Sequence, residues 1–308
     1  MKVPVIDFQH FDSGDADKLA TLTREVDSAL SMIGFMSLTN LGIEPALLRR
    51  VFAASQHYFH SDLTTKSACA YRSASENFGY QGMCEEHLDP LKPADLKETF
   101  TMRNVLHDSL DDSRWPSLEF RDLMHEFYRA SIDGAHKVQR VLAQALGMER
   151  DFFVRCHNGE NITLRLLYYP NTCTGEVADT QLGAGEHTDY GLLTLLFQDD
   201  VGGLEVRDAH NEWQAVDYVE SAIIVNSGDL LERWTNGRYR STWHRVKPKI
   251  GHRERFSIAV FVDPDSATPV SVLDSCITAD KPAQYPPVTA GEHLQQKILA
   301  THIAKSAN

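Results

Sequence analysis

The sequence has few cysteines and no long apolar run, and each absence excludes a class of protein. Its five cysteines, Cys69, Cys84, Cys156, Cys173 and Cys276, are scattered and form no C-x-x-C pair. They predict reduced thiols in a cytoplasmic protein rather than a disulfide framework or a zinc site. No stretch approaches the roughly 20 consecutive apolar residues of a membrane span. The N-terminal MKVPVIDF also lacks the apolar segment of a secretory signal.

Positive charge is also scarce. The chain of 308 residues has 30 Lys and Arg against 43 Asp and Glu, which gives a net charge of −13. A nucleic-acid surface needs a clustered basic stripe, and an anionic membrane repels such a chain, so neither partner is expected. Apolar content of 42% and charged content of 24% are near globular averages. These values predict a packed core, and they leave the oligomeric state open.

The first half of the chain shows helical and strand patterns in alternation. Five segments carry a regular pattern: strands at 3–8 and 34–43, and helices at 17–33, 44–60 and 117–146. Residues 61–112 are predicted to be rich in loops and contain the segments ENFGYQG and DLKETFTM. The expected N-terminal part is therefore mainly helical.

After residue 160 the pattern changes to short β-rich segments. They lie at 162–170, 187–199, 203–208, 212–217, 221–229, 239–248 and 255–265, and a last helix is expected at 290–304. Many short strands separated by turn residues indicate a β-sandwich or barrel. The predicted fold class is α+β and mainly β, with a double-stranded β-helix (jelly roll) core, a helical N-terminal part and a C-terminal helix.

Three tripeptides place an aspartate two residues after a histidine: His10-Phe11-Asp12, His87-Leu88-Asp89 and His187-Thr188-Asp189. About one such H-x-D is expected by chance in a chain of this composition, so the tripeptide alone is weak. The first lies in the polar turn FQHFDSGDAD, and the second lies in EEHLDPLKP, which prolines interrupt. Only the third, in GEHTDYGLLTLLFQ, stands at the start of an apolar strand, so we predict that it carries the chemistry.

Strand alternation predicts that His187 and Asp189 point to the same face. That face would continue through Leu193, Leu195 and Phe197, which suits the interior of a barrel. An ionised carboxylate is costly in such an interior unless it is paired or bound to a cation. A neutral imidazole beside it favours a divalent first-row metal, which His nitrogen and carboxylate oxygen bind at about 2.0–2.2 Å.

A metal at this place needs a further ligand, and His244 in STWHRVKP is the best candidate. It lies on a later predicted strand, after a hairpin turn expected at Asn236-Gly237. Two histidines and one carboxylate leave one face of an octahedral metal open, as non-haem Fe(II) oxygenases require. A structural zinc site is usually closed by four ligands, often thiolates, and no cysteine is suitably placed. The prediction is a catalytic metal site formed by His187, Asp189 and His244.

The segment RFSIAVFV places Arg255 and Ser257 on one face of another predicted strand. A guanidinium at the start of so apolar a strand favours a bidentate anion. A dicarboxylate cosubstrate would supply that anion, and Ser257 would donate a further hydrogen bond. The sequence thus predicts an anion site in the same barrel as the metal.

Taken in order, these segments resemble the Fe(II)/2-oxoglutarate-dependent oxygenase superfamily, in its isopenicillin N synthase-like branch. VPVIDF and GFMSLTNLGI resemble its N-terminal strand and turn, and DLKETFTM resembles its D-x-K-E-x-F segment. LRLLYYP, HTDYGLLTLL, DDVGGLEV, VNSGDLLERWTNGRYRSTWHRV and RFSIAVFVDP follow its catalytic core in order. The resemblance implies one structural unit: an N-terminal non-haem dioxygenase-type region at 1–115, a long support helix at 116–150, the oxygenase jelly-roll core at 151–270 and a C-terminal helical segment at 271–308.

The resemblance also implies a reaction and roles for residues. Fe(II) would be held by the three predicted ligands, and 2-oxoglutarate would chelate it with its far carboxylate on Arg255 and Ser257. Tyr169, in LRLLYYP, matches a tyrosine that contacts the cosubstrate in plant members. With O2, oxidative decarboxylation of 2-oxoglutarate to succinate and CO2 would drive hydroxylation, desaturation or cyclisation of a small-molecule substrate.

Other functions on the same fold stay open at this point. An oxidase of the isopenicillin N synthase type, or a plant ethylene-forming oxidase, would use the same metal ligands without 2-oxoglutarate. HTDYGLL and QDDVGGL also resemble the microbial ethylene-forming enzyme, which has a functional arginine where this chain has Arg165. Plant members usually have Asn where this chain has Leu167. A more distant alternative is a non-catalytic jelly-roll protein that binds a metal for structural purposes.

Overall fold

The computed structural model describes residues 2–86, 88, 92–106, 111–171, 181–247 and 253–297. Its helices are α1 (Ala16–Met32), α2 (Pro45–Phe59), α3 (Leu63–Ala68), α4 (Leu118–Ala145) and α5 (Asp229–Trp234), and residues 290–297 are also helical. Its strands are β1 (Val5–Asp7), β2 (Phe35–Thr39), β3 (Phe78–Gln81), β4 (Glu98–Arg103), β5 (Ile162–Tyr169), β6 (Ala184–His187), β7 (Leu193–Gln198), β8 (Leu204–Arg207), β9 (Trp213–Ala215), β10 (Ile223–Ser227), β11 (His244–Val246), β12 (Arg255–Val262), β13 (Pro269–Val270) and β14 (Val288–Thr289).

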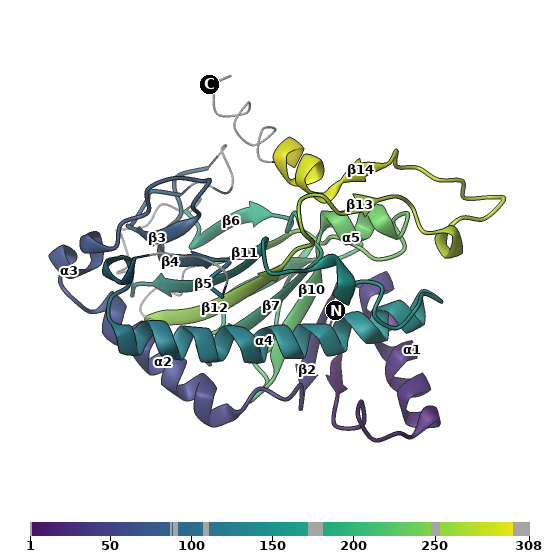
Figure 1. Ribbon diagram of the computed structural model, residues 1–308, viewed down its shortest axis with the longest axis horizontal. Coiled ribbons are helices and arrows are strands. Elements are labelled where there is room, and N and C mark those ends of the chain that lie inside the picture. Colours follow the sequence, from purple (N-terminus) through teal and green to yellow (C-terminus); the bar gives the residue numbers. More distant parts are fainter. Residues whose placement is uncertain are drawn as a thin grey trace.

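Two β-sheets form the centre of the molecule (Figure 1). The larger has the strand order β1-β2-β10-β7-β12-β5-β4-β3, and the smaller has the order β6-β11-β8-β9. Strands β5, β7, β10 and β12 of the larger sheet and β6, β8 and β11 of the smaller one line a shared cavity. The predicted jelly-roll core in a mainly β, α+β fold is therefore confirmed.

Strand β7 shows how the sequence pattern builds this core. Leu193, Leu195 and Phe197 belong to the main hydrophobic cluster, and the ring of Phe197 lies 5.0 Å from a phenylalanine ring of α4. The alternate residues Thr194 and Leu196 line the cavity instead. Because successive strand residues point to opposite faces, one apolar strand both anchors the helices and forms the wall of the cavity.

Helix α4 runs across the outer face of the larger sheet, and α1 and α2 contact it there (Figure 1). Its start is fixed by Ser117, whose hydroxyl accepts a hydrogen bond from the backbone N–H of Phe120 at 3.1 Å. The buried residues of α4 form an apolar stripe that faces the sheet. The three helices expected at 17–33, 44–60 and 117–146 are all present. None of the helices in the described ranges has the length and apolar content needed to cross a bilayer.

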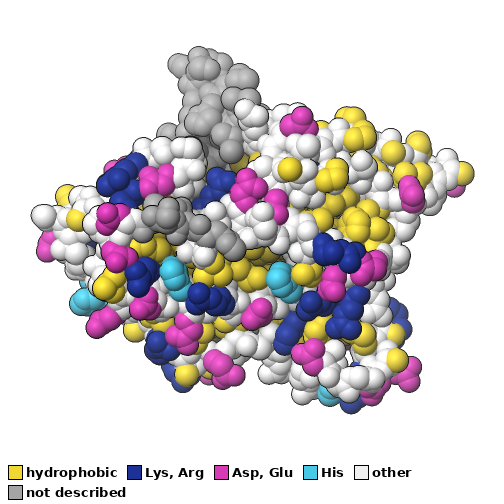
Figure 2. Space-filling model, in the orientation of Figure 1, with side chains coloured by type: hydrophobic (Ala, Val, Ile, Leu, Met, Phe, Trp, Pro, Cys, Tyr) yellow, Lys and Arg dark blue, Asp and Glu magenta, His cyan; other side chains and the backbone are white. Residues whose placement is uncertain are grey.

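Charged side chains of both signs cover the surface outside these layers. Figure 2 shows Lys and Arg side chains lying among Asp and Glu side chains on one face of the molecule. Arg50 of α2, for example, pairs with Glu126 of α4 at 3.0 Å, and both side chains are largely exposed. Basic charge on this face is therefore mixed with acidic charge, which agrees with the scarcity of positive charge in the sequence.

One prediction about local structure is wrong, and one segment contains elements that were not predicted. Between its loops, the segment 61–112 also contains α3, β3 and β4, and β3 and β4 extend the large sheet beyond β5. These short strands owe their conformation to pairing with distant strands, which a local pattern does not reveal. The hairpin turn expected at Asn236-Gly237 joins no two strands, because α5 lies between β10 and β11 and the turn follows α5. The last predicted helix is helical to residue 297, and its remainder lies outside the described residues.

Candidate active site

The three predicted metal ligands meet in the cavity between the sheets. His187 is the last residue of β6 and His244 is the first residue of β11, and the two are direct partners in this antiparallel strand pair. Asp189 lies two residues beyond β6 and is buried. The pairing register of two short strands thus brings together side chains that are far apart in the sequence.

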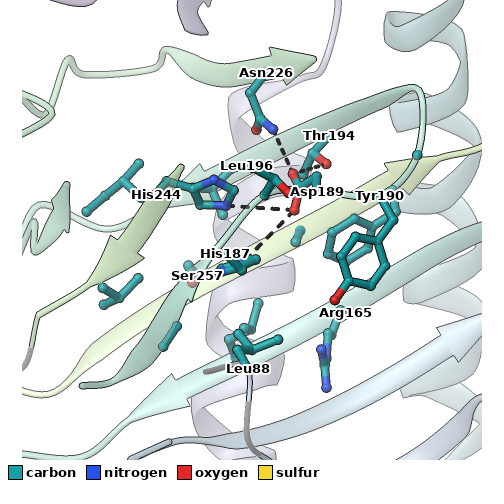
Figure 3. Close-up of a pocket in the computed structure, with 18 of the residues that line it drawn as sticks. Leu88, Arg165, His187, Asp189, Tyr190, Thr194, Leu196, Asn226, His244 and Ser257 are labelled. Carbon is teal, nitrogen blue, oxygen red and sulfur yellow. Dashed lines mark hydrogen bonds and ion pairs between the residues drawn. The ribbon is translucent and has the colours of Figure 1, made fainter. Parts of the chain in front are cut away.

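The side chains converge on one point (Figure 3). Asp189 Oδ1 lies 3.9 Å from His187 Nε2 and 3.7 Å from His244 Nε2. The two imidazole ring centres are 4.2 Å apart. One ligand atom from each residue lies within 4.8 Å of the others. These separations suit three donors that share one metal ion with bonds of about 2.0–2.2 Å.

Backbone hydrogen bonds fix which nitrogen of each histidine faces the centre. His187 Nδ1 lies 2.7 Å from the carbonyl oxygen of Gly185, and His244 Nδ1 lies 3.1 Å from that of Thr242. A carbonyl oxygen only accepts, so each Nδ1 carries the proton and donates. Each Nε2 therefore keeps its lone pair for a metal, which is the usual arrangement of metal-binding histidines.

Two neighbouring side chains orient the carboxylate in the same way. Asp189 Oδ2 accepts hydrogen bonds from Thr194 Oγ1 at 2.5 Å and from Asn226 Nδ2 at 2.7 Å (Figure 3). Thr194 lies on β7 and Asn226 on β10, both in the large sheet, whereas Asp189 follows β6 of the small sheet. Side chains of one sheet therefore orient a ligand that the other sheet supplies. Oδ1 is left to face the two imidazoles.

The protonation states also suit a metal. Burial, together with the neighbouring His244, lowers the pKa of His187 to about 3, so its imidazole is neutral at physiological pH. Burial alone would raise the pKa of Asp189, but the two histidines and the hydrogen bonds from Thr194 and Asn226 outweigh it and lower that pKa. Two imidazole nitrogens and one ionised carboxylate are the donor set that divalent iron prefers, so these residues fit the predicted metal.

One detail of the sequence prediction is wrong. The pattern predicts His187 and Asp189 on one strand whose face continues through Leu193, Leu195 and Phe197. The structure instead ends β6 at His187 and starts β7 at Leu193 in the other sheet, and these three apolar side chains face away from the cavity. The ligands converge because the chain crosses from one sheet to the other between them, not because a single strand alternates.

A buried cation lies in the same cavity. Arg255, at the start of β12, is 4% exposed, and its Nη1 donates to Ser257 Oγ at 2.9 Å. Its guanidinium carbon lies 4.8 Å from the ring centre of Tyr169, and Tyr169 pairs with Arg255 across β5 and β12. Arg255 Nε is buried without a hydrogen-bond partner. A buried guanidinium with donor capacity left is a suitable site for a carboxylate.

The first of the other H-x-D tripeptides does not join this site. Asp12 is exposed and pairs with Lys137 at 3.2 Å on the surface. His87 and Asp89 lie outside the described residues. Within the described ranges, His187, Asp189 and His244 are the one group of three or more His, Cys, Asp or Glu residues placed to hold a metal ion.

The family and the similar proteins of this chain show which reaction class the site serves. The model of the 2OG-Fe(II) oxygenase superfamily matches residues 161–264, and that of the "non-haem dioxygenase in morphine synthesis N-terminal" region matches residues 3–122. The 2-oxoglutarate-Fe(II) type oxidoreductase hxnY of Emericella nidulans is 34% identical over 302 residues, with 93% of this chain and 86% of hxnY covered. The chain belongs to the 2OG-Fe(II) oxygenase superfamily.

Solved structures of this superfamily share the fold along almost the whole chain. A full-length Neurospora crassa protein in complex with alpha-KG matches with a TM-score of 0.87 and 29% identity over 96% of both chains. JOX2 in complex with 2OG, Fe and JA matches with a TM-score of 0.81 and 28% identity over 97% of this chain and 85% of JOX2. The protein is an Fe(II)/2-oxoglutarate-dependent dioxygenase, and the predicted cofactors Fe(II), 2-oxoglutarate and O2 are confirmed.

Sequence reasoning missed the groups that orient the site. Thr194 and Asn226 are polar residues inside the apolar runs LTLLFQ and IIVNS, and that interruption was the available signal. It also missed Asp95, which is buried and accepts hydrogen bonds from the backbone N–H of Gly185 at 2.9 Å and from Lys97 Nζ at 2.7 Å. Through Asp95, the loop before β4 holds the strand that ends in His187.

Proposed function

We propose that this oxygenase oxidises a small-molecule substrate at an iron held by His187, Asp189 and His244, with release of succinate and CO2. The observation that carries the proposal is the convergence of three free donor atoms in the cavity that also contains Arg255 and Ser257. Bound Fe(II) supplies the activation of O2 that couples oxidative decarboxylation of 2-oxoglutarate to removal of hydrogen from the substrate. Hydroxylation, desaturation and cyclisation are all outcomes of that step.

The residues around the ligands keep the donors in place. Thr194 and Asn226 hold one oxygen of Asp189, so the carboxylate offers a single oxygen and cannot rotate to offer both. The backbone contacts of His187 and His244 hold each ring with Nε2 toward the centre. Three protein donors on one side leave the other side for a chelating 2-oxo acid and O2.

Neighbouring side chains also orient the end of the cavity that would take the cosubstrate. Arg255 is held by Ser257, by Gln198 Oε1 at 3.2 Å and by the ring of Tyr169, so its guanidinium is oriented before any ligand arrives. We assign Arg255 and Ser257 to the far carboxylate of 2-oxoglutarate and Tyr169 to packing against it. Apolar wall residues such as Leu167 exclude water, which strengthens the charge pairing.

A small substrate is consistent with the size of the cavity, which is about 280 Å³. The Neurospora crassa protein was also crystallised with alpha-KG and thymine, and JOX2 with JA, so similar folds bind small organic molecules.

The proposed ligand and anion residues all lie within the proposed core at 151–270, with 1–115, 116–150 and 271–308 as supporting parts. The four described cysteines are free thiols, which supports the proposed cytoplasmic location.

The experiment that tests this function is a coupled assay of O2 uptake and succinate release. Enzyme with Fe(II) and 2-oxoglutarate is presented with panels of amino acids, peptides, nucleobases and small aromatic metabolites. A true substrate should raise succinate formation at least about tenfold over background, in equal amounts with oxidised product found by mass spectrometry. Oxidised product formed without 2-oxoglutarate would instead identify an oxidase of the isopenicillin N synthase type. No O2 uptake with any compound would favour a non-catalytic protein.

A further inference from the structure

The cavity contains two charged side chains without an oppositely charged partner. Lys97 pairs with Asp95 at 2.7 Å and Arg165 pairs with Glu86, so their charges are balanced. Arg255 and Asp263 line the same cavity, and neither has an opposite charge within 4.0 Å in the described part of the chain. The proposed function assigns Arg255 to the cosubstrate. It assigns no ligand to Asp263.

Asp263 lies on the same face of the β12 segment as Arg255 and Ser257, the residues of the anion site. It directly follows β12, and every second residue from Arg255 onward lines the cavity: Arg255, Ser257, Ala259, Phe261 and Asp263. Alternation places all five on one face. The cavity therefore has a basic group near the start of this face and an acidic group at its end.

The carboxylate of Asp263 is held firmly but keeps acceptor capacity. Its Oδ1 accepts a hydrogen bond from the backbone N–H of Leu192 at 2.9 Å, and its backbone carbonyl accepts one from His157 Nδ1 at 2.9 Å. Gly191 lies so close that a Cβ there would be 1.5 Å from Oδ1. No hydrogen bond to Oδ2 is present in the described ranges, so this oxygen is available to a ligand in the cavity.

A carboxylate without a counter-charge is unfavourable at this depth. Burial raises the pKa of Asp263 to about 7, and the hydrogen bond from the Leu192 N–H and the more distant charge of Arg103 oppose that shift only in part. A buried carboxylate is stabilised when a cation or an N–H donor binds to it. Among the described residues, the basic side chains that line the cavity are otherwise engaged, so we assign the cation to the ligand.

We infer that Asp263 is a specificity-determining residue that binds a positively charged nitrogen of the substrate, such as a protonated amine or amidine. This inference rests on the proposed function, because the cosubstrate has to occupy the Arg255 end for the substrate to meet Asp263. The same reasoning excludes substrates whose only charge is a carboxylate directed at this end. Phe261 and Leu294 line the cavity as well and offer apolar surface to the carbon skeleton of such a molecule.

The test uses three probes of nearly the same shape: benzamidinium, benzamide and benzoate. Each is titrated by calorimetry into holoenzyme kept anaerobic with Fe(II) and saturating 2-oxoglutarate. We expect benzamidinium to bind roughly 10-fold or more tightly than benzamide, because a hydrogen bond to a charged group is stronger than a neutral one. Benzoate should bind most weakly. Asp263→Asn keeps an oxygen for the Leu192 N–H and should reduce the preference for benzamidinium to less than about threefold.

The matched control is Asp265→Asn, because Asp265 lies two residues further along and does not line the cavity. It should leave the preference unchanged, and neither variant should change the affinity for 2-oxoglutarate. The inference is overturned if benzamide or benzoate binds the wild-type enzyme as tightly as benzamidinium, if no probe binds while 2-oxoglutarate does, or if Asp263→Asn keeps the full preference. Failure of the wild-type enzyme to bind 2-oxoglutarate would contradict the proposed function instead. The wild-type comparison needs no variant and stands even if Asp263→Asn folds poorly.

Discussion

Replacing Asp189 by alanine is expected to abolish turnover and the charge-transfer absorption of the anaerobic complex with Fe(II) and 2-oxoglutarate. The substitution removes the one anionic donor of the site and leaves only the two imidazole donors. It also leaves Thr194 and Asn226 without the acceptor that they share. Since a catalytic metal contributes several kcal/mol to the reaction, the rate should fall by at least about 10³-fold. Absorption spectra and succinate assays measure both effects.

Two further variants make this test specific. Asp12→Ala removes the exposed aspartate of another H-x-D tripeptide and should change neither the spectrum nor the rate. Asn226→Ala keeps all three ligands but removes one hydrogen bond to Asp189, so iron affinity should fall by about 10–100-fold. An unchanged charge-transfer band in Asp189→Ala would show that this carboxylate does not bind the iron.

Replacing Arg255 by leucine is expected to raise the KM for 2-oxoglutarate by about 10²–10³-fold. Removing one partner of a buried, hydrogen-bonded charge pair costs about 2–5 kcal/mol, because the other charge is left unpaired in an apolar wall. Arg255 lies among Ser257, Gln198 and the ring of Tyr169, so water has little access to a carboxylate bound there. Arg255→Lys keeps the charge but loses the two-pronged geometry and should have an intermediate KM.

The measurement is a titration of 2-oxoglutarate in the succinate assay, together with iron binding followed separately. Iron affinity should not change in Arg255→Leu, because the metal ligands are other residues. Arg253→Leu is the matched control, since Arg253 lies two positions earlier, is exposed and pairs with Asp200 at the surface. A KM for 2-oxoglutarate within threefold of the wild-type value in Arg255→Leu would refute the assignment of the anion site.

The sequence predicts which residues form the site better than it predicts how the chain arranges them, and the reason is physical. His187, Asp189, His244, Arg255 and Ser257 could be found because each is a polar residue in or beside an apolar strand, where polarity is costly. The same signal was present at Thr194 and Asn226 but is ambiguous there, since small neutral polar residues often occur in strands without a special role.

The path of the chain through the site could not be predicted from local pattern. The break between β6 and β7 depends on which sheet each strand joins, and that choice is set by pairing partners far away in the sequence. The strands β3 and β4 depend on β5 in the same way. Helices α1, α2 and α4 were predictable because their apolar period is local and long. The available oxygen of Asp263 is a property of the folded cavity and has no signature in the sequence.

The central claim is that three side chains from distant parts of the chain hold one iron ion. Its most direct test is an anomalous difference map, measured at the iron edge, from crystals grown anaerobically with Fe(II) and 2-oxoglutarate. We predict a single strong peak about 2.0–2.2 Å from His187 Nε2, His244 Nε2 and Asp189 Oδ1, with the far carboxylate of 2-oxoglutarate on Arg255. A peak elsewhere, or none at these three atoms in crystals that contain iron, would contradict the account.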